Sequence, residues 1–146
     1  MRYAFAGIVL DFPPEWRDVT DDLPVGTPPT LARGDHAMGV LQFTIARYTG
    51  GKPPEYDSRV LISLARQFES AHALIPAGTI GGFVNPTFVT FGVFADYSQE
   101  GSSRRVWFVS DGEHLAFVTF TGVPGTSCEW ARELWEADEM VRSIAF

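Results

Sequence analysis

The sequence predicts an α+β domain in which a central antiparallel β-sheet is flanked by two main helices. Three β-prone runs between residues 88 and 122 are separated by a polar Gly/Ser loop and by a tight turn at residues 110–113, as in a β-meander. Two other segments, residues 57–73 and 127–144, repeat apolar side chains at the helical period. The chain has 146 residues, the commonest size for one domain, so we assign residues 1–146 to a single domain.

The N-terminal residues predict two short strands that end at a proline corner. Residues 3–6 and 8–12 are β-prone, and the glycine between them marks a bend or a bulge. Two consecutive prolines end the second strand, because proline cannot donate a ladder hydrogen bond. Trp16 follows, and its ring either plugs the end of the sheet or contacts a ligand. The next segment, residues 18–29, holds three prolines and is either a rigid binding loop or a plain connector.

The middle of the chain predicts a long strand followed by a helix. Within residues 38–48, apolar side chains occupy every second position from Leu41 to Ile45, as in a strand with one buried face. The helix at residues 57–73 begins at Asp57, whose side chain is a good N-cap, and it ends before a proline. Shorter strands are expected at residues 30–34 and 79–84.

The last two strands of the predicted meander, residues 105–110 and 114–121, are apolar on both faces. A sheet with one wet face would show a cleaner alternation with polar residues. Either the helices and loops of the chain cover both faces, or one face is offered to a partner.

The final helix, residues 127–144, carries an apolar stripe and a neighbouring acidic stripe, and Thr126 or Ser127 can cap it. The acidic stripe either meets a basic partner or is an ordinary solvated face. Trp135 lies off the apolar stripe and is either a second core contact or an exposed interface aromatic. The apolar stripe consists of Trp130, Leu134, Ala137, Val141 and Ile144, and the acidic stripe of Glu129, Glu133 and Glu136.

The net charge of −7 is concentrated at the two ends of the chain. Residues 1–22 hold five acids and two bases, and residues 129–146 hold the same numbers, so each segment has a net charge of −3. Such a chain lacks the clustered Lys and Arg that grip nucleic acid, whereas its field would steer a basic partner. Alternatively, the negative charge only keeps the protein soluble.

The single cysteine, Cys128, excludes an internal disulfide and fits a reducing compartment. The N-terminal residues do not have the form of a signal peptide, and no apolar run approaches the ~20 residues of a membrane span. We therefore expect a cytoplasmic bacterial protein that binds no membrane.

No catalytic signature is present. The three histidines, His36, His72 and His114, lack a second His or Cys at metal-ligand spacing, and Cys128 has no partner that the sequence can identify. The glycines at residues 78–82 lack the Lys-Ser/Thr pair of a phosphate-binding loop. We expect a protein with no catalytic residue, no metal and no cofactor.

Four segments together resemble the PsbP-like fold, the fold of the photosystem II oxygen-evolving subunit P, which a small nuclear-import factor and many small bacterial proteins share. The resemblance concerns order and pattern over nearly the whole chain, and it implies an α/β/α sandwich. The segments are the proline corner VLDFPPEW (residues 9–16), the helix after the long strand, the hairpin VWFVSDGEHLAFVTFTG (residues 106–122) and the closing segment EMVRSIAF (residues 139–146).

The resemblance implies a binding or assembly protein and supplies no shared catalytic residues. Its cytoplasmic bacterial members include immunity proteins and effector-associated chaperones of toxin secretion. We therefore expect an immunity protein, monomeric or homodimeric, that binds and neutralises a cognate toxin and binds no nucleic acid. The alternatives are a secretion chaperone for a hydrophobic segment of an effector and a small-ligand-binding protein. The expected partner contacts are Asp18, Asp21, Asp22, Tyr48, Tyr56, Glu129, Glu133 and Glu136.

Overall fold

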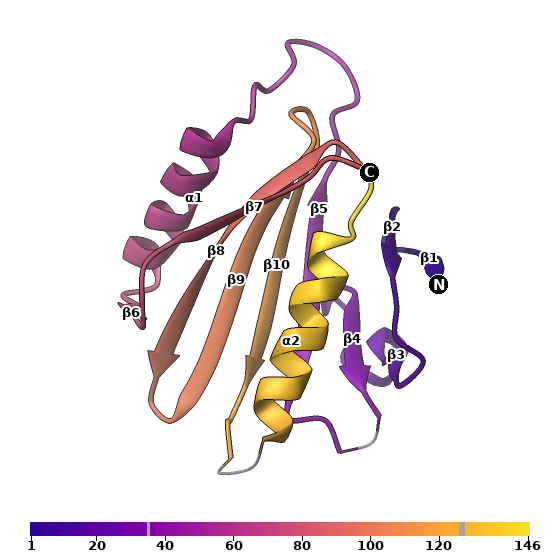
Figure 1. The fold of residues 1–146 in the computed structure, drawn as a ribbon, viewed down its shortest axis with the longest axis vertical. Coiled ribbons are helices and arrows are strands. Elements are labelled where there is room, and N and C mark those ends of the chain that lie inside the picture. Colours follow the sequence, from indigo (N-terminus) through magenta and orange to yellow (C-terminus); the bar gives the residue numbers. More distant parts are fainter. Residues whose placement is uncertain (35, 126–127) are drawn as a thin grey trace.

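The β-meander lies in the middle of one antiparallel sheet of eight strands (Figure 1). The computed structural model describes residues 1–34, 36–125 and 128–146. Across the sheet the strands follow the order β3-β4-β5-β10-β9-β8-β6, and β7 also pairs with β8. The strands are β3 (Trp16–Asp18), β4 (Thr30–Arg33), β5 (Gly39–Ala46), β6 (Ile75–Pro76), β7 (Gly81–Asn85), β8 (Thr90–Gln99), β9 (Ser102–Ser110) and β10 (Leu115–Gly122).

The N-terminal residues form a separate two-stranded hairpin of β1 (Arg2–Phe5) and β2 (Ile8–Asp11). Both strands were predicted, and Gly7 lies in the tight turn between them with a φ of 85°, a conformation that favours glycine. The backbone N–H of Val9 donates to the carbonyl of Ala145 at 2.9 Å, and the reverse bond measures 2.8 Å. The hairpin is therefore joined directly to the C-terminal residues.

The two helices, α1 (Ser58–Ala71) and α2 (Glu129–Arg142), pack against opposite faces of the sheet (Figure 1). The predicted N-cap of α1 is confirmed, because the Asp57 side chain accepts a hydrogen bond from the backbone N–H of Val60 at 2.9 Å. The cap predicted for α2 falls on residues 126 and 127, which lie outside the described residues.

Both apolar faces of the meander are covered by other elements of the chain. In β9, Val106 and Phe108 belong to the cluster under α1, whereas Trp107 and Val109 belong to the cluster under α2 and the N-terminal hairpin. Helix α1 packs mainly on β8 and β9 and reaches β10 through the contact of Phe68 with Phe117, so its side of the sheet is open over β5 and the later part of β10. Most side chains at that open part are polar, namely Gln42, Thr44, Thr119 and Thr121, and Val40 lies beside them.

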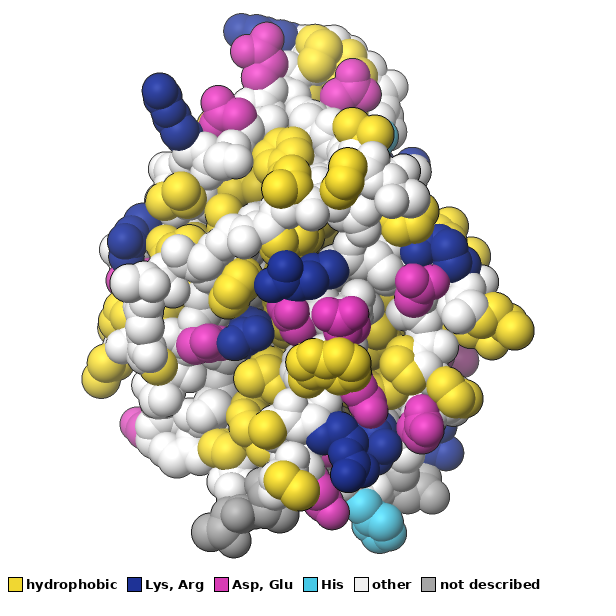
Figure 2. Space-filling view, viewed as in Figure 1, with side chains coloured by type: hydrophobic (Ala, Val, Ile, Leu, Met, Phe, Trp, Pro, Cys, Tyr) yellow, Lys and Arg dark blue, Asp and Glu magenta, His cyan; other side chains and the backbone are white. Residues whose placement is uncertain are grey.

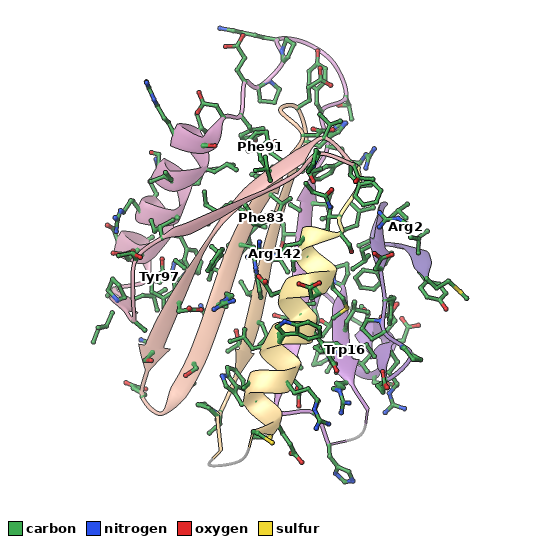
Figure 3. The ribbon with its side chains drawn as sticks, in the orientation of Figure 1. Arg2, Trp16, Phe83, Phe91, Tyr97 and Arg142 are labelled. Atoms are coloured by element: carbon green, nitrogen blue, oxygen red, sulfur yellow. The ribbon has the colours of Figure 1, made fainter. Side chains whose placement is uncertain are left out.

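Trp16 plugs the core, which confirms one of the two predicted roles. Its ring is 3% exposed and lies 6.1 Å from the ring of Phe120 between centroids. The indole N–H donates to Glu136 Oε2 on α2 at 2.6 Å, and Figure 3 shows Trp16 beside this helix. Trp16 also begins β3, a strand that the sequence pattern did not predict, and the loop after β3 holds the short helix η1 (Thr20–Asp22).

A polar contact joins α1 to the sheet within an otherwise apolar interface. The Tyr97 hydroxyl of β8 donates to Glu69 Oε2 at 3.2 Å (Figure 3). Burial, and then the neighbouring charge of Glu69, raises the pKa of Tyr97 to about 12, because both disfavour the ionised phenolate. The inward side of α1 consists of aliphatic and aromatic groups such as Leu61, Ala65 and Phe68.

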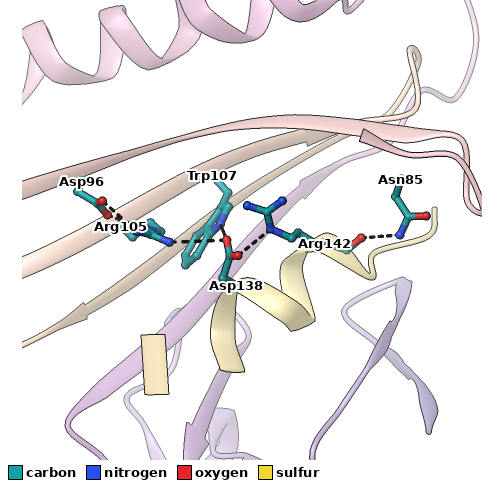
Figure 4. A network of polar contacts seen from close by, with 6 residues as sticks. All are labelled: Asn85, Asp96, Arg105, Trp107, Asp138 and Arg142. Carbon is teal, nitrogen blue, oxygen red and sulfur yellow. Dashed lines mark hydrogen bonds and ion pairs between the residues drawn. The ribbon is translucent and has the colours of Figure 1, made fainter. Parts of the chain in front are cut away.

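Helix α2 is held to the sheet by a charged network centred on Asp138 (Figure 4). The carboxylate of Asp138 accepts from Trp107 Nε1 at 3.0 Å and from Arg142 Nε at 2.7 Å. Arg105 lies 3.7 Å from the same carboxylate and donates twice to Asp96, at 2.6 and 2.9 Å. Burial acts to lower the pKa of Arg105, but Asp96 and Asp138 outweigh it and raise that pKa above its ordinary value. The directional bonds of this network fix the rotation of α2 about its own axis.

The C-terminal end of α2 is also tied to β7. The Asn85 side chain donates to the backbone carbonyl of Arg142 at 2.8 Å, which satisfies one of the carbonyls left free at a helix end (Figure 4). The Arg142 guanidinium lies 4.8 Å from the centroid of the Phe83 ring, and Figure 3 shows the two side chains close together. Helix α2 is thus fixed along its length.

Candidate protein-binding surface

Helix α2 turns a large apolar side chain and a neighbouring carboxylate outward in its second half. Trp135 is 65% exposed, and Glu139 follows it by four residues, so both lie on the same side of the helix. The inward positions are taken by buried residues such as Ala137 and Val141. Of the two roles predicted for Trp135, the structure therefore supports an exposed aromatic and excludes a core contact.

The proline corner of the N-terminal hairpin lies beside these two side chains. A groove of about 360 Å³ is lined by residues of both segments, among them Phe12, Pro13, Trp135 and Glu139. A second groove of about 330 Å³ lies on the other side of the corner and is lined by Tyr3, Trp16 and Asp18 among others. We call this region the corner surface, and it consists of Tyr3, Asp11, Phe12, Pro13, Pro14, Trp135 and Glu139 together with the two grooves.

Hydrogen bonds between the hairpin and α2 make the corner surface rigid. Arg2 donates to the carbonyl of Ser143 at 2.8 Å and lies 3.4 Å from Asp11. The backbone N–H of Asp11 in turn donates to the Ser143 hydroxyl at 2.7 Å. Because these contacts join residues far apart in sequence, they place the proline corner and α2 in one fixed arrangement. A binding surface that is already ordered loses less conformational entropy when a partner binds.

The acidic stripe predicted on α2 is corrected for two of its three members, because Glu133 and Glu136 face inward and form neither a solvated face nor a surface for a basic partner. Glu133 is 4% exposed, and its carboxylate accepts from the backbone N–H groups of Met38 at 2.9 Å and Gly39 at 3.2 Å. Glu136 accepts from Trp16, as described above, and from Arg33 Nε at 3.0 Å. The donors to both carboxylates lie beneath the inner side of the helix. Glu133 and Glu136 therefore join α2 to the neighbouring strands.

Glu129, the remaining member of the predicted stripe, is exposed at the start of α2. It borders a separate groove of about 220 Å³ whose other charged residues include Arg33 and Arg132. This groove lies at the N-terminal end of the helix, so Glu129 does not belong to the corner surface.

The predicted loop acids are near the corner surface but differ in their roles. Asp18 lines the second groove and also accepts from the backbone N–H and the hydroxyl of Thr20, which shapes the start of η1. Asp21 and Asp22 are exposed on η1 itself. Asp18 is thus the one predicted acid of this loop that lines a groove of the corner surface.

The two predicted tyrosines lie elsewhere, in the loop that leads to α1 at the upper end of Figure 1. The Tyr48 hydroxyl donates to the carbonyl of Gly51 at 2.6 Å, and the backbone N–H of Tyr48 donates to His114 Nδ1 at 2.9 Å. Tyr56 is partly buried against the cluster under α1. The structure therefore does not bring Tyr48 and Tyr56 together with the acidic loop or with α2.

None of the seven residues that define the corner surface was among the expected partner contacts, although an exposed interface aromatic was one of the two roles predicted for Trp135. The available signal was the position of Trp135 off the apolar stripe, combined with a carboxylate four residues later. Figure 2, seen from the side of α2, shows apolar, acidic and basic side chains interspersed on and beside this helix. Aromatic groups set among charges are typical anchors of protein interfaces.

Two further observations concern other kinds of site. Within residues 1–34, 36–125 and 128–146, no group of three or more His, Cys, Asp and Glu side chains could hold a metal ion. Neither described helix combines the length and the hydropathy that a bilayer crossing requires.

Comparison with known proteins identifies the architecture. The sequence matches no known protein family, and it matches no curated protein. The solution structure of cyanobacterial PsbP (CyanoP) from Synechocystis sp. PCC 6803 is similar, with a TM-score of 0.59 and 12% identity over 99% of this chain and 90% of that chain. A crystal structure from Bacteroides thetaiotaomicron VPI-5482 has a TM-score of 0.50 and 12% identity over 94% of this chain and 44% of that one. Identity this low speaks to architecture alone, and the chain has a PsbP-like fold.

Proposed function

We propose that this chain is a non-catalytic cytoplasmic protein-binding module, an immunity protein that binds and neutralises a cognate bacterial toxin. The observation that carries the proposal is the exposure of Trp135. This side chain is 65% exposed, although it lies on a helix that hydrogen bonds hold in one orientation. An exposed indole does little for the stability of its own chain, whereas tryptophan is among the residues most enriched at the energetic centres of interfaces.

Charge supports the same proposal. The chain carries a net charge of −7, and Asp11, Asp18 and Glu139 lie around the exposed aromatic groups. An acidic surface accelerates the association of a basic partner and disfavours acidic competitors. Neutralisation of a toxin requires only such a complementary, rigid surface, without a reaction carried out by the immunity protein.

The proposal is tested by affinity capture from the native host, followed by a growth assay with the captured protein. We expect a bound protein that arrests growth when it is expressed alone and that no longer does so when this chain is co-expressed. The double variant Trp135→Ala, Glu139→Lys is expected to lose capture and protection. Recovery of no growth-inhibiting partner would sink the proposal.

A matched control separates the surface from a general charge effect. Glu113→Lys makes the same charge change at an exposed residue in the turn between β9 and β10, away from the corner surface. This variant is expected to capture the partner and protect growth as the unaltered chain does. Equal loss in both variants would assign the effect to net charge and not to the corner surface.

A second candidate function, a secretion chaperone that holds a hydrophobic segment of an effector, is favoured by a different region. A groove of about 320 Å³ lies between α1 and β7, and its lining, which includes Ile62, Ile80, Val84 and Phe91, contains no charged residue. The other grooves described above all contain charged side chains. An uncharged, apolar groove fits an apolar segment.

Gly82 offers a way to close this groove without disturbing the fold. A Cβ atom at this position would meet only the carbonyl oxygen of Gly92, at 3.5 Å, which is an ordinary contact. The variant Gly82→Val is therefore expected to fold normally and to fill the groove. If Gly82→Val abolishes capture of the partner while the Trp135→Ala, Glu139→Lys variant retains it, the chaperone function replaces the immunity function.

A further inference from the structure

The two grooves of the corner surface share one ridge. Phe12, Pro13 and Pro14 line both grooves, so the grooves lie on either side of the proline corner. The Tyr3 and Phe12 rings pack edge to face, with centroids 5.4 Å apart, and this contact stabilises the ridge. A partner segment that occupies both grooves must cross the ridge. An extended chain can do this, whereas an amphipathic helix requires one uninterrupted trough.

The aromatic groups at the two grooves carry unused hydrogen-bond donors. Tyr3 is 45% exposed, and within the described part of the chain neither its hydroxyl nor the indole N–H of Trp135 has a hydrogen-bond partner. Trp16 and Trp107, in contrast, donate to carboxylates inside the molecule. Donors presented on flat apolar rings fit a backbone that offers carbonyl acceptors but few N–H groups, as a proline-rich segment does.

The carboxylate beside the exposed indole adds a requirement for positive charge. Glu139 lies one helical turn from Trp135, and Asp11 lines the same groove. A planar guanidinium can stack on an indole and donate to a carboxylate at the same time, which a lysine ammonium does less well. The combination therefore favours arginine at this groove.

We propose that the corner surface binds an extended, proline-containing segment of its partner and that an arginine of this segment lies between Trp135 and Glu139. The second groove, beside Tyr3 and Trp16, holds the apolar and proline residues of the same segment. This proposal rests on the proposed function, because it names the kind of segment by which the partner is recognised.

The test uses the full chain and three synthetic peptides, with binding measured by calorimetry and by tryptophan fluorescence. The probe is the peptide APPLPPLPRA. One matched peptide, APPLPPLPEA, reverses the charge, and the other, AGSLGSLGRA, keeps the charge and removes the prolines. We expect saturable binding of the probe at or below ~1 mM, and binding at least about tenfold weaker for each matched peptide.

Variants of the chain localise the binding. Glu139→Gln is expected to weaken binding of the probe about tenfold, as for the loss of one charged hydrogen bond, and Trp135→Ala to remove it. Glu113→Lys should leave it unchanged. All three positions are exposed, so the thermal melts of the variants should match that of the unaltered chain.

The outcomes distinguish this proposal from the proposed function. If the toxin partner is captured through Trp135 but no probe peptide binds at ~1 mM, the partner is recognised by another shape and this proposal fails alone. If the probe binds with the expected preferences and no toxin is found, the proposed function fails and the proposal on the segment stands. Binding that ignores the arginine or is insensitive to Trp135→Ala would overturn the proposal.

Discussion

The two helices have equal length and cover opposite faces of one sheet, yet they are held in different ways. Each has 14 residues. Helix α1 packs through apolar groups such as Leu61 and Ala65, with the contact between Tyr97 and Glu69 at its edge. Helix α2 adds three inward carboxylates, Glu133, Glu136 and Asp138, each hydrogen-bonded to another element. Apolar packing tolerates small rotations, whereas directional bonds fix the rotation of α2 and hence the direction of Trp135.

The largest expected effect compares two neighbours of β9 that point to opposite faces. Trp107→Ala should lower the free energy of unfolding by about 4 kcal/mol or more, because the ring is fully buried and its N–H bonds to Asp138. Phe108→Ala, toward α1, should cost about 3 kcal/mol. Urea denaturation with unchanged m values measures both. An equal or larger loss for Phe108→Ala would contradict the difference between the two faces.

Removal of one inward carboxylate should have the next largest effect. Glu133→Ala leaves the backbone N–H groups of Met38 and Gly39 without their acceptor and is expected to cost about 2 kcal/mol. Glu69→Ala on the opposite helix should cost less than about 1 kcal/mol, because it removes one bond at the edge of an apolar interface. The same denaturation experiment measures both. A loss of about equal size would remove the distinction between the helices.

The pH dependence of stability reports on the burial of Tyr97 under α1 together with its contact with Glu69. The pKa of Tyr97 is raised to about 12, so the stabilisation is complete below pH 10, the ordinary pKa of tyrosine, and is lost as the pH rises from 10 to 12. Between pH 9 and pH 11 the advantage of the unaltered chain over Tyr97→Phe should shrink by about 1 kcal/mol. Groups that titrate in both proteins cancel in this difference. A constant difference across this range would show that Tyr97 ionises freely in the folded protein.

The smallest expected effect is at the outward side of α2. Trp135→Ala should change the free energy of unfolding by less than about 0.5 kcal/mol, because the side chain is 65% exposed. Differential scanning calorimetry is sufficient to measure this. A loss comparable with that of Glu133→Ala would mean that Trp135 supports the fold and is not kept exposed for an interface.

Sequence periodicity was sufficient to predict the fold, because the spacing of buried apolar side chains determines which segments form strands and helices. The alternation of Val106 and Phe108 with Trp107 and Val109 identified a strand apolar on both faces, and the structure places these pairs in separate clusters. Asp57 was recognised as a cap because capping depends on local sequence alone. The strand at Trp16 was missed because three residues after a double proline give no periodic signal. This strand forms only through its pairing with β4.

The site was less predictable, because its residues meet only in three dimensions. Glu133 and Glu136 have the spacing of an exposed acidic stripe, yet donors on distant strands draw them inward. Tyr3 and Trp135 are separated by most of the chain, and no local pattern relates them. Sequence identified the acidic character of α2, but which carboxylates remain at the surface depends on long-range hydrogen bonds.

The pairing of β2 with Ala145 has a consequence for when the corner surface exists. The surface combines residues 3–14 with residues 135–139, so one half of it emerges from the ribosome long before the other. The hairpin cannot dock before α2 and the residues after it are synthesised, because its partners lie there. A chain cut before residue 135 therefore lacks one half of the corner surface and also the residues on which the hairpin docks.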